Sequence, residues 1–106
     1  MERIEKSSGN VYKDLGVANP EQMLIKATLA AKIGEILAQR KLTQLEAAKL
    51  LGVPQPKVSA LLRGQFRGIS EAKMLECLNR LGRDVDIVVR KPTRSRVGGR
   101  TNVVFA

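Results

Sequence analysis

The sequence contains no histidine and no tryptophan, and its only cysteine is Cys77. A lone cysteine cannot form an internal disulfide, and without histidine the usual zinc and iron sites are excluded. General acid–base catalysis also has few groups to use, because histidine is absent and paired carboxylates are not evident. We therefore expect no catalytic residues, no metal and no other cofactor, in a protein that is not an enzyme.

Long hydrophobic runs are missing as well. No apolar segment reaches the ~18 residues of a membrane span, and the N-terminus is charged rather than signal-like. We expect a cytoplasmic protein with no membrane partner. Aromatic residues make up only 3% of the 106 residues, whereas 43% are hydrophobic. This aliphatic composition favours one small domain built from helices packed on helices.

Positive charge is abundant and unevenly placed. The chain has 19 basic and 10 acidic residues, a net charge of +9. Residues 26–69 alone carry eight basic and two acidic residues, whereas residues 1–20 are neutral and residues 91–106 carry four basic residues and no acid. Such a concentration indicates a polyanionic partner. The alternative is a surface charge that only keeps the protein soluble.

Helical periodicity and capping residues predict the main elements. A long helix is expected from residue 20 to about residue 39, with Asn19 as its N-cap, Pro20 in the first turn and Gln22 at the capping-box position. Thr43 and Glu46 form a second predicted capping box. A last helix is expected between Ser70 and residue 82, and we read Cys77 beside its apolar stripe as a small core or interface residue.

Residues 44–51 and 55–62 are two short amphipathic patterns on either side of Gly52. Ala48 allows close approach of two helices, Gly52 allows a sharp turn, and Val58 and Leu61 supply a buried face. This spacing is typical of a helix-turn-helix. The predicted fold is an all-α, helix-turn-helix repressor-like bundle of four to five helices, with the DNA-binding domain at residues 20–83.

The predicted bundle is followed by one C-terminal β-strand at residues 84–91, in which Val85, Ile87 and Val89 alternate with more polar residues. One isolated strand is unstable, so we expect it to pair with the same strand of a second copy and to form the dimer interface. The only other β-like stretch is residues 102–105. Residues 1–19 are an arm that either covers the core or binds a partner, and residues 92–106 are a basic flexible tail.

The second helix of the motif is expected to enter the major groove of DNA. The predicted base-facing residues are Gln55, Pro56, Ser59 and Ala60, and the predicted phosphate contacts are Thr43, Gln44, Lys57, Arg63, Gln65 and Arg67. The amide of Gln55 suits N6 and N7 of adenine. Alternatives remain open: Gln44 and Gln55 could be merely solvated, Pro56 could only stiffen the helix start, Arg67 could only be solubilising, and Phe66 could pin the loop or touch a partner.

Residues 43–44, 46–48, 51–53, 55–59 and 61–64 resemble the phage-repressor-like (XRE) helix-turn-helix proteins. A wider pattern, which includes residues 9–12, 14–16, 19–21, 26–27 and 81–87, resembles the HigA-type antitoxins of that family. One departure is Pro54, which stands where Ser or Thr usually caps the recognition helix.

The resemblance implies a homodimeric transcriptional repressor. It would bind double-stranded operator DNA with inverted repeats and neutralise a cognate toxin, usually a ribosome-dependent ribonuclease that cleaves messenger RNA. A stand-alone, phage-derived regulator without a toxin is the alternative. A small basic ribonuclease is a third hypothesis, and the lack of acid–base groups disfavours it.

Overall fold

The computed structural model describes residues 2–3, 19–92 and 98–106. Its elements are strand β1 (Glu2–Arg3), helices α2 (Pro20–Gln39), α3 (Gln44–Leu51), α4 (Gln55–Leu62) and α5 (Glu71–Arg80), and strand β2 (Val104–Phe105). The predicted fold class is confirmed, since the described chain is a bundle of four helices with one strand near the C-terminus. None of these helices is long and apolar enough to cross a membrane.

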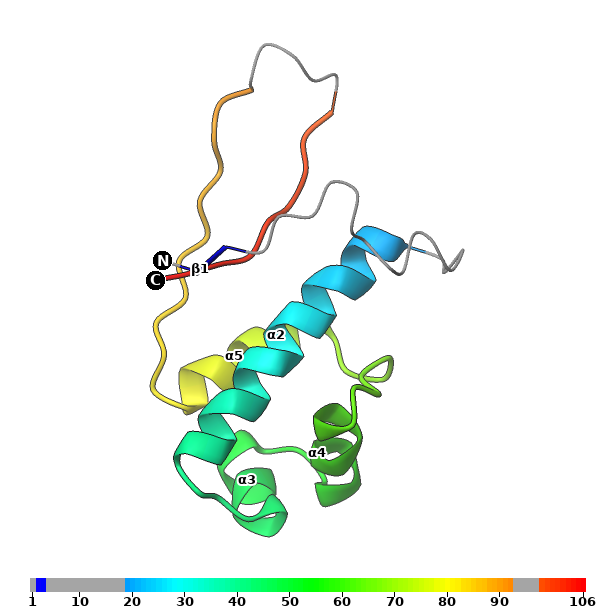
Figure 1. The fold of residues 1–106 in the computed structure, drawn as a ribbon, viewed down its shortest axis with the longest axis vertical. Coiled ribbons are helices and arrows are strands. Elements are labelled where there is room, and N and C mark those ends of the chain that lie inside the picture. Colours follow the sequence, from blue (N-terminus) through cyan, green and yellow to red (C-terminus); the bar gives the residue numbers. More distant parts are fainter. Residues whose placement is uncertain (1, 4–18, 93–97) are drawn as a thin grey trace.

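The core lies where the four helices meet. Helix α2 packs on α5 and α4, and α3 packs on α4 and α5, so the two short helices sit together at one end of the long one (Figure 1). Ile33 of α2, Leu51 of α3, Val58 of α4, and Met74 and Cys77 of α5 each expose less than 2% of their surface. The core placement of Cys77 is thereby confirmed, and burial raises the pKa of its thiol.

Two of the predicted helix starts have the expected caps. The Thr43 hydroxyl accepts a hydrogen bond from the Glu46 N–H at 3.1 Å, and the Glu46 carboxylate accepts one from the Thr43 N–H at 2.9 Å. The Ser70 hydroxyl accepts from the Lys73 N–H at 3.1 Å. Because these bonds satisfy amides that a helix leaves unpaired, they fix where α3 and α5 begin.

The start of α2 differs from the prediction. Asn19 adopts the left-handed conformation, with φ 54° and ψ 56°, and its side chain makes no capping hydrogen bond. An N-cap side chain reaches the helix amides from an extended backbone, so the capping-box interpretation of residues 19–22 is wrong. Asparagine tolerates the left-handed region, and the Asn19 carbonyl still accepts from the Met23 N–H at 3.1 Å.

The predicted strand over residues 84–91 does not form within a single chain, and its pairing with a second copy stays a prediction. Residues 83–92 leave α5 along an extended path and form no strand within the described chain (Figure 1). Strand β2 instead pairs antiparallel with β1, with Glu2 opposite Phe105 and Arg3 opposite Val104. Among the described residues the segment has no partner strand, and a strand without a partner gains no ladder hydrogen bonds.

The two ends of the chain are therefore joined beside the helical bundle (Figure 1). Val103 packs against the core, and the Lys32 ammonium of α2 lies 4.6 Å from the centroid of the Phe105 ring. The prediction of a flexible tail over residues 92–106 does not fit residues 103–105, because these contacts attach them to α2 and β1. Residues 1, 4–18 and 93–97, which include most of the predicted arm, lie outside the described residues.

Candidate nucleic-acid interface

The turn between α3 and α4 has the geometry of a helix-turn-helix. Gly52 has a φ of +69°, and its N–H donates to the Ala48 carbonyl at 2.9 Å. The N–H of Val53 reaches the same carbonyl at 3.2 Å, and Ala48 is buried. A side chain at Gly52 would strain this left-handed backbone, which explains the glycine.

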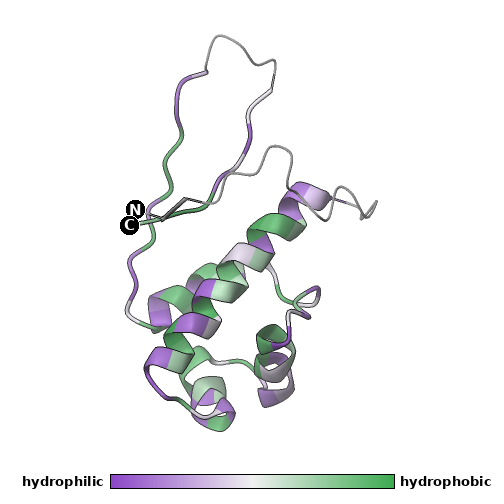
Figure 2. Ribbon diagram, viewed as in Figure 1, coloured by the Kyte–Doolittle hydropathy of each residue, from purple (hydrophilic) through white to green (hydrophobic). Residues whose placement is uncertain are grey.

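Helix α4 has one buried and one exposed face. Val58 and Leu61 expose 1% and 5% of their surface and anchor the helix in the core. Of the four predicted base-facing residues, Gln55 and Pro56 are exposed in the first turn, whereas Ser59 and Ala60 are half-buried. Figure 2 shows this mixture of hydrophilic and hydrophobic residues along each helix. Pro54 precedes α4 without a side-chain cap, as the sequence implies.

A basic loop, residues 63–69, follows α4 and is fixed by two buried side chains and two hydrogen bonds to α4. Phe66 and Ile69 are buried at 3% and 5% exposure, which confirms that Phe66 pins the loop to the core. The Gln65 N–H donates to the Ala60 carbonyl at 2.8 Å, and the Lys57 ammonium donates to the Gly68 carbonyl at 3.0 Å. The loop therefore stays beside α4, with its polar side chains exposed.

Arg63 does not extend freely into solvent. Its guanidinium donates from Nη1 to the Ser59 hydroxyl at 2.6 Å and from Nη2 to the Gln65 side-chain carbonyl at 3.4 Å. Two predicted phosphate contacts, Arg63 and Gln65, are thus joined to a predicted base-facing residue. Arg67, the other arginine of the loop, is exposed.

The start of α3 adds the remaining predicted contacts. Thr43 and Gln44 are both exposed at the N-terminus of this helix, where backbone N–H groups and the helix dipole favour an anion. Glu46 is the only acidic residue between positions 43 and 68. Its carboxylate is engaged with Thr43, and these hydrogen bonds lower its pKa. The same span holds four basic residues, so its net charge is positive.

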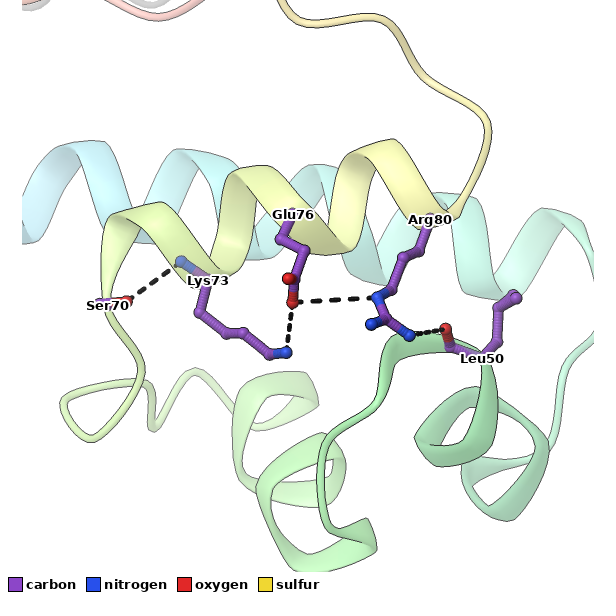
Figure 3. Close-up of polar contacts among 5 residues, drawn as sticks. All are labelled: Leu50, Ser70, Lys73, Glu76 and Arg80. Carbon is purple, nitrogen blue, oxygen red and sulfur yellow. Dashed lines mark hydrogen bonds and ion pairs between the residues drawn. The ribbon is translucent and has the colours of Figure 1, made fainter.

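A polar network that the sequence did not reveal connects α5 to the turn (Figure 3). Arg80 donates from Nη1 to the Leu50 carbonyl at 3.4 Å, and its Nε lies 3.8 Å from the Glu76 carboxylate. Glu76 also pairs with Lys73, and the hydrogen bond and charge of Lys73 lower the pKa of Glu76. The only local signal was a basic residue in the last turn of α5.

The three predicted dimer-interface residues lie on the extended segment after α5. Val85 is half-buried and packs against the core, whereas Ile87 and Val89 expose 80% and 92% of their surface. Figure 2 shows hydrophobic residues along this segment, away from the helices. Such a row of exposed aliphatic residues is unusual on the surface of a monomer.

Comparison with known proteins places this geometry in a family. The model of a family described as "Helix-turn-helix domain" matches residues 11–90. A solved structure of a candidate XRE-family transcriptional regulator is 41% identical, covers 81% of this chain and 97% of its own, and superposes with a TM-score of 0.75. No curated protein matches the sequence. The chain belongs to the XRE family of helix-turn-helix transcriptional regulators.

Proposed function

We propose that this regulator is a sequence-specific repressor of its own operon, acts as a homodimer in the cytoplasm, and is the antitoxin of a type II toxin–antitoxin module. The observation that carries the DNA-binding part is the exposed face of α4. It presents Gln55 on a rigid helix whose opposite face is buried, and Glu46 is the only acidic residue in the motif and its loop.

Base recognition is assigned to the exposed face of α4, because the second helix of a helix-turn-helix lies in the major groove. The exposed amide of Gln55 can donate to N7 and accept from N6 of adenine, and the Pro56 ring can contact a thymine methyl group. Ser59 and Ala60 are short enough to let the helix approach the bases.

Phosphate contacts are assigned to both sides of that helix. Thr43 and Gln44 lie at the start of α3, and Lys57, Gln65 and Arg67 belong to α4 and the loop after it. The Lys57 ammonium makes one hydrogen bond, to Gly68, and its remaining N–H groups can bind a phosphate while it holds the loop.

The dimer is assigned to residues 84–90 of two copies paired antiparallel about a two-fold axis at Ile87. In this register Val85 lies opposite Val89, and Asp84 lies opposite Arg90 of the second copy. Aliphatic and opposite-charge cross-strand pairs stabilise such a ribbon. A two-fold dimer binds inverted repeats, with half-sites separated by about one DNA turn, ~34–36 Å.

The decisive experiment for DNA binding is a footprint on the duplex upstream of the gene, followed by affinity measurements at several salt concentrations. We expect protection of an inverted repeat and an affinity that falls steeply as salt rises. A protein that binds no duplex in a salt-dependent manner would refute the proposal.

The antitoxin role is supported by the resemblance of residues 9–91 to HigA-type antitoxins. Its test is co-expression with the small reading frame next to the gene. We expect the two products to co-purify, and the neighbour alone to arrest growth and cleave messenger RNA. If no neighbour binds, the stand-alone regulator is correct. The purified chain should not cleave RNA by itself. Cleavage would favour the ribonuclease hypothesis.

A further inference from the structure

Arg63 is held over the exposed face of α4 by two hydrogen bonds. Its guanidinium donates to the Ser59 hydroxyl at 2.6 Å and to the Gln65 side-chain carbonyl at 3.4 Å. One partner lies a helical turn earlier and the other lies two residues later. These two acceptors keep a long side chain from sampling its other rotamers, which is the condition for a directional contact.

Gln55, Ser59 and Arg63 follow one another at intervals of four residues, so they lie along one side of α4 and its C-cap. Eight residues of helix span ~12 Å, which corresponds to about three to four base pairs at 3.4 Å each. A helix in the groove that reads one base pair with Gln55 therefore carries Arg63 to another base pair about three to four steps away.

We propose that Arg63 reads a guanine, with Ser59 and Gln65 as the positioning residues of its guanidinium. Each terminal nitrogen of Arg63 uses one N–H within the protein and keeps a second, and Nε has its own. Two of these can donate to O6 and N7 of guanine, the most frequent specific contact in the major groove. The inference rests on the proposed DNA-binding function and replaces the phosphate contact expected from the sequence.

The experiment starts from a duplex that the wild-type protein selects from a random pool, with a scrambled duplex of equal length as its reference. Arg63→Ala is compared with Arg67→Ala, an exposed arginine of the same loop. Arg63→Ala should weaken binding to the selected duplex by about 5- to 150-fold and leave the scrambled duplex nearly unaffected. Arg67→Ala should weaken both duplexes to a similar extent.

A second selection with Arg63→Ala identifies the base pair concerned. Its consensus should lose one G·C pair, about three to four base pairs from the pair whose preference Gln55→Ala removes. Ser59→Ala should reduce the same G·C preference in part, because Arg63 then lacks the shorter of its two hydrogen bonds. Circular dichroism verifies that each variant folds. We expect all of them to fold, because the substituted residues are exposed or half-buried.

The proposal is overturned if Arg63→Ala weakens both duplexes equally and lowers the salt slope by about one, because that is the behaviour of a phosphate contact. It is also overturned if the second selection returns an unchanged consensus. Failure of the proposed function looks different, since the wild-type protein would then enrich no sequence in the first selection, and both proposals would fall.

Discussion

The guanidinium of Arg80 on α5 donates a hydrogen bond to the backbone carbonyl of Leu50 at 3.4 Å, across 30 residues of sequence. Leu50 lies in the last turn of α3, where carbonyl groups lack helical partners and the dipole favours a cation. A Cβ added to Gly52 would lie only 2.9 Å from Nη1 of the same guanidinium. Arg80 thereby couples α5 to the turn that sets the direction of α4.

Gly52→Ala should destabilise the fold slightly more than Gly64→Ala. Both glycines have positive φ, +69° and +77°, so each alanine incurs about 1–2 kcal/mol of backbone strain. A Cβ at Gly64 meets nothing within 4 Å, whereas one at Gly52 displaces Arg80. Urea denaturation of the two variants measures the difference.

A double-mutant cycle isolates the Arg80 contribution. In an Arg80→Ala background, Gly52→Ala should cost less than it does in the wild-type chain, because the displaced contact is already gone. If the two substitutions change the free energy of unfolding additively, Arg80 and Gly52 are not energetically coupled.

Gln55→Ala should weaken binding to the native operator by about 1–3 kcal/mol and blur the preference at one base pair. The reason is that a lost bidentate contact affects only the base it reads. Fluorescence anisotropy with single-substituted operators measures both effects, and Gln22→Ala, an exposed glutamine at the start of α2, is the matched control. An equal loss on random DNA would contradict a base-reading role.

Ile87→Asp should convert a dimer into a monomer and reduce operator affinity. In the proposed register two copies of Ile87 face each other, so the substitution opposes two carboxylates at the two-fold axis. Sedimentation should give a mass of 11.6 kDa for the variant and twice that value for the wild-type protein. Ile87→Val should remain dimeric, and a dimer that survives Ile87→Asp would place the interface elsewhere.

Acid should weaken the start of α3. The hydrogen bonds from Thr43, the backbone one first, lower the pKa of Glu46 below its ordinary value in the folded state. A carboxyl group with a lowered folded pKa stabilises the fold above its unfolded pKa, and this stabilisation is lost as the pH falls through the folded value. The midpoint temperature of thermal unfolding should therefore fall less steeply between pH 7 and pH 3 in Glu46→Gln than in the wild type. Identical slopes would show that the capping box does not titrate with folding.

Local sequence determined the helices because their signals are local. The Thr43–Glu46 capping box predicted the start of α3. The spacing of Ala48, Gly52 and Val58 predicted the turn between α3 and α4. The apolar face of each helix follows from its 3.6-residue period. Exposure of Gln55 follows from the same reasoning, whereas the sequence left open whether Phe66, a loop residue, pins the loop or touches a partner.

Tertiary structure decided what depends on residues far apart in the chain. The pairing of Glu2–Arg3 with Val104–Phe105 joins opposite termini, and Arg80 reaches Leu50 from another helix. Two local details also departed from the expectation: Asn19 has a left-handed backbone and does not cap α2, and Arg63 donates to Ser59, only four residues earlier. Hydrophobic period and capping preference act within a few residues, whereas strand pairing and side-chain direction depend on which surfaces folding brings together.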